Sequence, residues 1–304
     1  MKKSILVLTD FSENALHAAE IAFILAGQLK TNLSLLNCND TISAFTYYPV
    51  VPVMSESPTW YEDRKSKLKA ISEHLEQKFH LEFPEQAKPV IKCLIREGDL
   101  QTNLKDLLKH QPLEMIVMGA RSGSLTDHIL FGSNTKTIAN HSPIPVLVAP
   151  LSALVRRPLL ITFATNFLEQ DFHSLNYIAQ LRQRLGARLE IVHIREYGQI
   201  PDQRDPKTLH LIEKICNADP RFIVFKEVYG KDVSSRLNHY CLNNESDILA
   251  LSDNHHSFFN RVFIDDNVDK SLAEHLVPIL VIPELKSSQD IHKNTFRGLS
   301  NVVF

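Results

Sequence analysis

A glycine-containing loop, residues 118–134, has the residue types of an anion site. Gly119 directly follows a short apolar run, and Gly132 precedes a stretch with a helical pattern that starts at Ser133. Glycine lets a backbone approach an anion closely, and the free amides at a helix N-terminus point toward negative charge. The sequence therefore predicts that Gly132, Ser133 and Asn134 hold a phosphate group with backbone amides and a hydroxyl.

One acidic residue, Asp10, lies at the end of the first apolar run, "ILVLTD". A carboxylate at such a position suits a Mg²⁺ ion carried by a nucleotide, often through water. The phosphate motifs G-x-x-x-x-G-K-[ST] and G-x-G-x-x-G are both absent from the sequence. A glycine, a gap and Gly-Ser are by themselves as typical of a plain turn and a helix cap as of a phosphate site. The loop alone leaves both interpretations open.

The elements that would position these residues alternate between apolar runs and helical patterns. The runs are short and rich in Val, Ile and Leu, which is typical of strands buried on both faces of a parallel sheet. Ser12 is the predicted N-cap of the first helix, whose buried face is formed by Ala15, Ala18, Ala19, Ala22 and Leu25. Ligands of an open parallel sheet bind outside the carboxyl ends of its strands, where Asp10 and Gly119 fall.

The sequence contains an internal repeat. Four apolar runs of the first half have counterparts, in the same order, in the second half: 5–11 with 161–167, 32–37 with 188–193, 115–119 with 248–252, and 145–150 with 278–283. Each half is predicted as strand, helix, strand, helix, strand, helix, strand, helix, strand. We therefore expect an α/β protein with two tandem doubly wound parallel-sheet domains.

The repeat also predicts the domain boundaries. We expect one domain over residues 1–150, a second over 156–285 and a polar C-terminal tail over 286–304, with a linker near 151–158. Residues 41–60, rich in prolines and aromatics, have no counterpart of equal length in the second half. They are predicted to form an ordered loop, which is either a surface excursion packed by its own aromatics or a functional lid.

Composition and charge indicate a globular protein. The 304 residues are 44% hydrophobic and 22% charged, enough for two domains with their own cores. A net charge of −2 argues against nucleic-acid binding through a broad basic surface. The N-terminal apolar run is too short for a signal peptide or a membrane span, and the 4 cysteines form no C-x-x-C pair. We expect a cytoplasmic protein that binds neither nucleic acid nor membrane.

Three segments resemble the universal stress protein family in its tandem two-domain form. They are "VLTDFS" near the start, "GARSGSLTDHILFGS" before the last helix of the first half, and "PIPVLVAP" at the end of that half. The resemblance covers about residues 2–284. It implies domains of flavodoxin-like or adenine-nucleotide-hydrolase-like topology that pair through their last strands. Many members of the family bind ATP, and others bind no nucleotide.

The ATP-binding members carry Gly, two residues, Gly, nine residues, and then Gly followed by Ser or Thr. Gly119 matches the first glycine here, Gly132 and Ser133 match the last pair, and Ser122 replaces the middle glycine. A Ser held at positive φ would cost about 1 kcal/mol.

The resemblance implies a place for each part of ATP. Adenine would lie near Cys38, ribose near Met118, and Mg²⁺ near Asp10, while Arg121 would add positive charge beside the phosphates. The nucleotide site that the resemblance implies consists of Thr9, Asp10, Cys38, Met118, Gly119, Arg121, Ser122, Gly132, Ser133 and Asn134.

The second half departs from this pattern. Asn166 stands where Asp10 stands in the first half, and the positions of the three glycines and the serine are taken by Ser252, His255, Asp265 and Asp266. Two carboxylates at the phosphate position would repel a phosphate. We therefore expect the second domain to bind no ATP and to serve as a structural partner of the first.

Other functions have less support in the sequence. The histidines and acids within 253–269 are more typical of a solvated polar loop than of a metal site. Because no nucleophile elbow and no general base are recognisable, no catalytic residues are predicted, and a weak ATPase is the third option. We expect a stress-linked regulator that binds ATP with Mg²⁺ in its first domain. The alternative is a nucleotide-independent scaffold that acts through protein partners, with the two domains forming an intrachain pseudo-dimer and two chains a homodimer.

Overall fold

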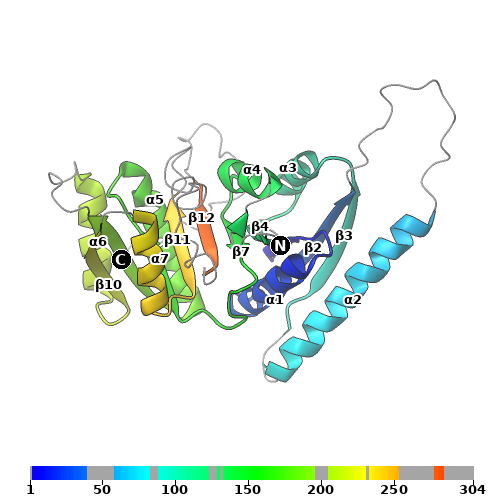
Figure 1. Cartoon of the computed structure of the whole chain (residues 1–304), viewed down its shortest axis with the longest axis horizontal. Helices are drawn as coiled ribbons and strands as arrows, with labels where there is room; N and C mark the ends of the chain where they lie inside the picture. The colour runs from blue at the N-terminus through cyan, green and yellow to red at the C-terminus, as the bar shows by residue number, and fades with distance from the viewer. Residues whose placement is uncertain are drawn as a thin grey trace.

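The computed structural model describes a three-layer α/β/α fold built on one ten-stranded sheet (Figure 1). The residues that it describes are 2–39, 58–82, 88–122, 129–130, 133–195, 205–230, 233–252 and 277–283.

The first half follows the predicted alternation of strands and helices, with a small hairpin inserted before its last helix. Its elements are β1 (Ser4–Leu8), α1 (Glu13–Gln28), β2 (Asn32–Asn39), α2 (Pro58–Glu82), β3 (Ile91–Glu97), α3 (Leu100–His110), β4 (Leu113–Gly119), β5 (Arg121–Ser122), β6 (Ile129–Leu130), α4 (Ser133–His141) and β7 (Val146–Ala149).

The second half repeats this order as far as the structure describes it. Its elements are β8 (Leu160–Ala164), α5 (Glu169–Leu185), β9 (Arg188–Arg195), α6 (Pro206–Ala218), β10 (Ile223–Tyr229), α7 (Val233–Asn243), β11 (Ile248–Ser252) and β12 (Ile279–Ile282). The last predicted helix of this half falls within 253–276, outside the described residues. The domain boundaries at 150 and 156 stay a prediction.

The strand order in the sheet is β10-β9-β8-β11-β12-β7-β4-β1-β2-β3. From the centre outwards, each half places its last strand first, then its fourth, first, second and third. Neighbours within each half are parallel, whereas β12 and β7 pair antiparallel at the centre. The predicted doubly wound sheets that pair through their last strands are thereby confirmed. Because the central pair is antiparallel, the carboxyl ends of the strands lie at opposite edges of the sheet in the two halves.

Strand side chains alternate between two hydrophobic cores, one on each face of the sheet. In β1, Ile5 and Val7 belong to the core covered by α1, α2, α5 and α6, whereas Leu6 and Leu8 belong to the core covered by α3, α4 and α7. Each core contains buried residues from both halves of the chain. The two halves therefore bury apolar surface jointly.

Helix α1 has the predicted cap and the predicted buried face. The Oγ atom of Ser12 accepts a hydrogen bond from the backbone N–H of Ala15 at 3.3 Å. The alanines and the leucine of the expected face are all buried, and Ala18 and Ala22 are 0% exposed. Their small side chains allow the helix axis to approach the sheet closely.

The loop predicted over residues 41–60 ends earlier than expected. Helix α2 begins at Pro58, so residues 58–60 form its first turn and the predicted boundary is wrong there. The fixed φ of proline suits the first positions of a helix, where its missing N–H is not needed. Residues 41–57 lie outside the described residues.

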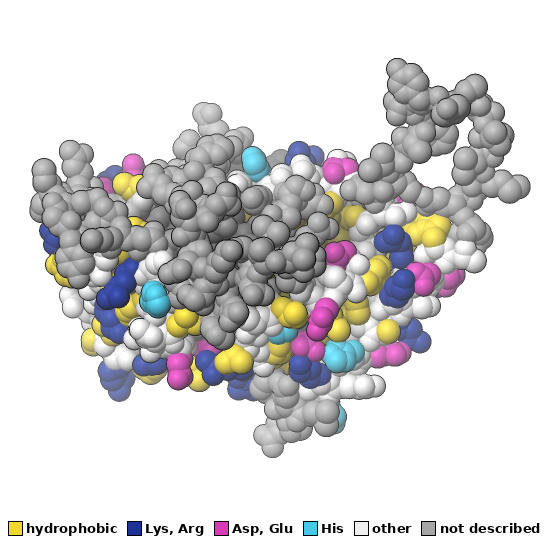
Figure 2. Space-filling view, viewed as in Figure 1, with side chains coloured by type: hydrophobic (Ala, Val, Ile, Leu, Met, Phe, Trp, Pro, Cys, Tyr) yellow, Lys and Arg dark blue, Asp and Glu magenta, His cyan; other side chains and the backbone are white. Residues whose placement is uncertain are grey.

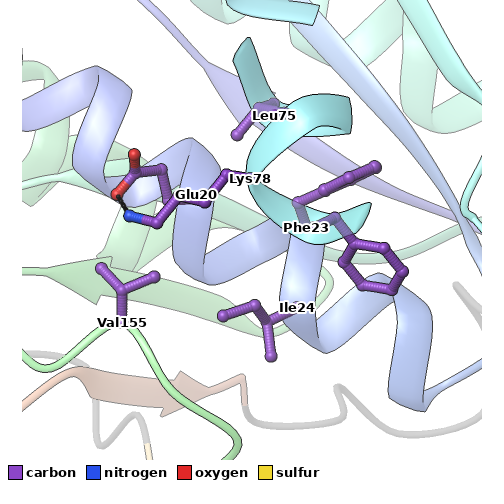
Figure 3. Close-up of a pocket in the computed structure, with 7 residues that line it drawn as sticks. Glu20, Phe23, Ile24, Leu75, Lys78 and Val155 are labelled. Atoms are coloured by element: carbon purple, nitrogen blue, oxygen red, sulfur yellow. Dashed lines mark hydrogen bonds and ion pairs between the residues drawn. The ribbon is translucent and has the colours of Figure 1, made fainter. Parts of the chain in front are cut away.

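A small pocket lies between α1, α2 and the predicted linker (Figure 3). One wall carries an ion pair between Glu20 and Lys78, at 2.7 Å, and Val155 of the linker closes another. The remaining lining is apolar: Phe23, Ile24, Leu75 and Phe79. Because it lies beside the second half of α1, away from Ser12, this pocket is separate from the strand-end edge of the first half.

The surface carries mixed charge. Lys, Arg, Asp and Glu side chains are interspersed on the face drawn in Figure 2. None of the described helices is long and apolar enough to cross a membrane. All four cysteines lie within the described residues, and none of them forms a disulfide.

A buried ion pair joins the two halves. The side chain of Glu114, on β4, is 2% exposed and pairs with Arg184, on α5 of the second half. Lys3 lies on the other side of the same carboxylate, with its Nζ atom 3.3 Å from Oε2. Arg184 also donates a hydrogen bond to the backbone oxygen of Leu29, at 3.4 Å. The buried Glu114 carboxylate, which needs positively charged partners, therefore anchors α5 to the first half.

Replacing Arg184 by Met should lower the stability of the chain, because the buried Glu114 carboxylate would then keep Lys3 alone of the two cations. Removing one member of a fully buried pair costs about 3–5 kcal/mol. Since the Arg184 side chain is 43% exposed, we expect the free energy of unfolding to fall by about 1–2 kcal/mol. Urea unfolding followed by circular dichroism measures the change. Arg188→Met, at an exposed position of β9, is the control, and equal losses in both variants would contradict the assignment.

Candidate functional site

The turn after β1 presents Asp10 at the edge where the strands of the first half end. Asp10 is exposed, and its Oδ1 atom accepts hydrogen bonds from the Ser12 N–H at 3.0 Å and the Ser12 hydroxyl at 2.5 Å. Between them, Phe11 has a left-handed φ of 67°, which is uncommon outside glycine. The Phe11 N–H donates to Thr9 Oγ1 at 3.1 Å. Local hydrogen bonds thus hold the carboxylate in place.

The end of β2 lies beside this turn. Asn37 is 2% exposed, and its Nδ2 atom donates to the backbone oxygen of Thr9 at 2.7 Å. Thr9 also donates its own N–H to the Leu36 backbone oxygen, at 2.9 Å. Cys38 follows and pairs with Arg96 of β3. The two residues before Cys38, whose backbone the family resemblance assigns to adenine, are therefore hydrogen-bonded to the turn that carries Asp10.

The end of β4 lies against the first turn of α1. A Cβ atom on Gly119 would come within 2.5 Å of the backbone oxygen of Asn14 and 3.1 Å of the Ala15 nitrogen. Glycine is therefore required here by helix–strand packing, whereas the sequence analysis explained it by close approach to an anion. Met118 is 6% exposed and packs in the core on the α3, α4 and α7 face, so only its backbone is available to a ribose.

The loop after β4 starts as a β-hairpin. Pairing of β5 with β6 places Arg121 and Ser122 in extended backbone, so Ser122 avoids the positive φ expected of a residue at a glycine position. Helix α4 begins at Ser133, as predicted. Gly132 and the side chains at 121, 122, 133 and 134 lie outside the part of the chain that the structure describes.

The sheet order brings several predicted site residues to one edge. β1 lies between β4 and β2, and the three strands are parallel, so Asp10, Cys38 and Gly119 all lie at or next to the carboxyl ends of adjacent strands. Between β1 and β4 the strand order reverses, and ligands of doubly wound sheets bind at such a point. The chain segment from β4 to α4 starts at the same edge. The topology therefore provides a single location for the predicted nucleotide site.

The chemistry of these groups fits a magnesium nucleotide. An exposed carboxylate offers the hard oxygen that Mg²⁺ prefers, and the N-terminus of α4 offers free backbone amides to phosphate. The described residues contain no group of three or more His, Cys, Asp or Glu side chains that could hold a metal ion by themselves. Asp10 is a single exposed carboxylate, a group that suits a Mg²⁺ ion whose other ligands come from a nucleotide.

The equivalent turn of the second half holds a carboxylate of its own. Asp171, in the first turn of α5, is 1% exposed. Its Oδ2 atom accepts hydrogen bonds from the Thr165 hydroxyl at 2.7 Å and the Asn166 N–H at 3.0 Å, and its Oδ1 atom from the Ser252 hydroxyl at 2.6 Å. Burial raises the pKa of Asp171 above its usual value, and the hydrogen bonds offset only part of this effect.

The two turns share their backbone conformation and their Thr and Phe side chains, and differ in the residues that pack against them. Phe167 has a φ of 61° at the position of Phe11, and its N–H donates to a threonine hydroxyl in the same way. Asp171 corresponds to Ala15, and Ser252 corresponds to Gly119. The sequence analysis missed Asp171, although an acid in the first turn of the helix was a visible signal. His255, Asp265 and Asp266, on which that analysis relied, lie outside the described residues.

Solved structures with a similar fold include a universal stress protein from Archaeoglobus fulgidus DSM 4304, which is 15% identical with a TM-score of 0.64 over 92% of this chain and 98% of that chain. A functionally unknown protein from Pseudomonas aeruginosa PAO1 is 14% identical, with a TM-score of 0.53 over 93% of both chains. At these identities the similarity shows the fold alone. A universal stress protein in complex with cAMP is 14% identical over 42% of this chain and 99% of that chain, with a TM-score of 0.30.

Comparison at the level of sequence points to one family. No curated protein matches the chain. The model of the universal stress protein family matches residues 1–150, the stretch that contains β1 to β7 and every predicted nucleotide-site residue. Through this first half, the chain belongs to the universal stress protein family.

Proposed function

We propose that the protein is a cytoplasmic stress-response regulator that binds one ATP with Mg²⁺ at the strand-end edge of its first half. Membership of the universal stress protein family supports the stress-response role. The observation that carries the nucleotide proposal is the exposed Asp10 carboxylate, held by Ser12 beside the point where the strand order reverses. The helix N-terminus at Ser133 follows the neighbouring strand and supplies amides for phosphate.

Each part of the site has a defined task in this proposal. Asp10 would hold the Mg²⁺ ion, and the first turn of α4 would donate backbone N–H groups to the phosphates. The main chain at Cys38 meets the adenine, and the backbone at Met118 and Gly119 meets the ribose. Mg²⁺, when bound with the nucleotide, neutralises part of the triphosphate charge. The protein's contribution is to bind and orient the nucleotide.

The second half supports a stoichiometry of one nucleotide per chain. Its equivalent edge holds the Asp171 carboxylate, which already uses the Thr165 and Ser252 hydroxyls and the Asn166 N–H. A carboxylate beside a helix N-terminus takes the electrostatic place of an anionic ligand. In this proposal the second half is a structural partner that completes the sheet and the two cores.

A nucleotide-independent scaffold is the second candidate, and one observation favours it. At one end of the sheet, as far as the structure describes it, β10 is an edge strand with Val224 42% and Tyr229 43% exposed. An open edge can pair with a strand of another chain. Sedimentation equilibrium would support this candidate if the protein formed a dimer that Val224→Lys disrupts, with the same result in the presence and absence of ATP.

Replacing Asp10 by Asn should weaken Mg²⁺-ATP binding about tenfold, which corresponds to about 1.4 kcal/mol. The amide keeps the size of the side chain and removes the charge that attracts Mg²⁺. Isothermal titration calorimetry should show one site in the wild-type protein, and a smaller difference between wild type and variant when Mg²⁺ is chelated. Asn166→Asp, the reverse change in the second half, is the matched control and should leave one site per chain.

Two results would count against this assignment. If the folded wild-type protein gave no binding heat, the nucleotide proposal would be wrong and the scaffold would be favoured. ATP turnover that Asp10→Asn abolishes would instead make the protein a weak ATPase.

Replacing Asp171 by Asn should make stability less dependent on pH. Because the pKa of Asp171 is raised in the folded protein, the stabilising effect of its protonated form is complete below the unfolded-state pKa of about 3.9. That effect is lost as the pH rises through the folded-state pKa. Asn does not ionise, so the variant should gain stability relative to wild type from pH 4 upward. Urea midpoints of both proteins between pH 4 and pH 7 test this, and a constant difference would contradict it.

A further inference from the structure

Helix α2 reaches the end of β2 through one side chain. The two terminal nitrogens of the Arg64 guanidinium donate to two asparagines that lie two residues apart on β2. Nη1 donates to Asn37 Oδ1, and Nη2 donates to Asn39 Oδ1 at 2.8 Å. Both acceptors are neutral amide oxygens. Arg64 therefore holds the end of β2 through two hydrogen bonds. Because both acceptors are neutral, they do not offset the positive charge of the guanidinium.

The contact continues to the turn that carries Asp10. Asn37 accepts from Arg64 through Oδ1 and donates through Nδ2 to the Thr9 backbone oxygen at 2.7 Å, so both ends of its buried amide are used. The hydroxyl of Thr9 in turn accepts from the Phe11 N–H at 3.1 Å. These hydrogen bonds thus link α2, through Asn37, to Thr9 and Phe11, the residues on either side of Asp10.

A second side chain of α2 contacts the same turn. The Nζ atom of Lys67 lies 5.6 Å from the centre of the Phe11 ring, within the range of a cation–π interaction. Arg64 and Lys67 are three residues apart and so share a face of the helix. Trp60, one turn earlier, lies 5.6 Å from the guanidinium carbon of Arg64 and supports its position. This face of α2 is therefore directed at the end of β2 and the Asp10 turn.

The second half ties its corresponding helix to its turn by other means. The Asp205 N–H donates to the Phe167 backbone oxygen at 2.9 Å, and the Thr208 hydroxyl donates to the Leu168 backbone oxygen at 3.0 Å. Ile212, buried in the core, occupies the position six residues after the helix's first proline, where α2 has Arg64. Only the first half, among the described residues, uses a long charged side chain for this link.

We propose that Arg64 is a positioning residue of the nucleotide site, which fixes the Asp10 turn through Asn37 and Thr9 and thereby makes nucleotide binding depend on the placement of α2. This inference rests on the proposed binding of ATP with Mg²⁺ in the first half. Arg64 acts on the ligand through the turn. Its effect should therefore fall on the Mg²⁺-triphosphate part of the ligand and not on the nucleoside part.

The first test needs no nucleotide. In Arg64→Met, amide hydrogen exchange of the peptide spanning residues 8–14, measured by mass spectrometry, should be at least tenfold faster than in the wild-type protein. Arg64→Lys keeps the charge but its single ammonium group cannot span Asn37 and Asn39, so its exchange should resemble that of the Met variant. Lys69→Met, which removes an exposed cation from the same helix, is the control and should exchange as the wild type does.

The second test compares ligands by calorimetry. Arg64→Met and Arg64→Lys should each weaken Mg²⁺-ATP at least tenfold and adenosine by no more than twofold, while Lys69→Met should leave both affinities unchanged. Equal losses for adenosine and Mg²⁺-ATP would mean that Arg64 contacts the nucleoside directly, which overturns the positioning role. A normal affinity in Arg64→Lys would show that charge alone is needed, and would overturn it as well.

The two tests separate failure of this inference from failure of the proposed function. Unchanged exchange in Arg64→Met would show that α2 does not hold the turn, whether or not the protein binds ATP. Faster exchange in Arg64→Met, combined with an absence of nucleotide binding by the wild-type protein, would confirm the link to the turn and overturn both its role in binding and the proposed function. Faster exchange with unchanged Mg²⁺-ATP affinity would overturn the positioning role alone.

Discussion

The antiparallel pairing of β7 with β12 joins the two halves of the chain at the centre of the sheet. Val146 to Val148 pair with Ile279 to Val281, and every residue of both strands is buried. This one contact turns two five-stranded sheets into a single sheet, and it allows each face to carry one core that contains residues of both halves. It also places the carboxyl ends of the strands of the two halves at opposite edges of the sheet, so one ligand cannot contact both edges.

The turn after the first strand has the same backbone conformation in both halves, but different residues pack against it. Both turns place a phenylalanine at positive φ over a threonine hydroxyl, and each turn leads into a helix that lies against the end of the fourth strand. Where the first half has Ala15 and Gly119, helix and strand touch through backbone atoms. Where the second half has Asp171 and Ser252, a carboxylate lies between them and needs every donor around it, because an unpaired buried charge is costly. The first half thus presents an exposed carboxylate, Asp10, whereas the second half buries the Asp171 carboxylate among donors of its own chain.

In the first half, side chains of α2 contact the Asp10 turn and the neighbouring end of β2. Arg64 and Lys67 approach from α2, which is 25 residues long, whereas the corresponding helix α6 has 13 residues. A guanidinium bound to neutral amides keeps its charge, so α2 adds positive potential near the end of β2 while it holds Asn37 in one orientation. In the arrangement that we propose, the rigidity of the Asp10 turn therefore depends on how α2 packs against the sheet.

Local periodicity and capping chemistry predicted the main alternation of strands and helices as far as the structure describes it, the buried alanine face of α1, the Ser12 cap and the start of α4, but not the β5–β6 hairpin. Tertiary structure decided the rest. Asp171 meets Ser252 across 81 residues, Glu114 meets Arg184 across 70, and Asn37 meets Arg64 across 27. Gly119 also acquires its packing role only where β4 meets α1. These contacts depend on how separate elements pack together in the fold, and neither residue type nor spacing along the chain carries that information.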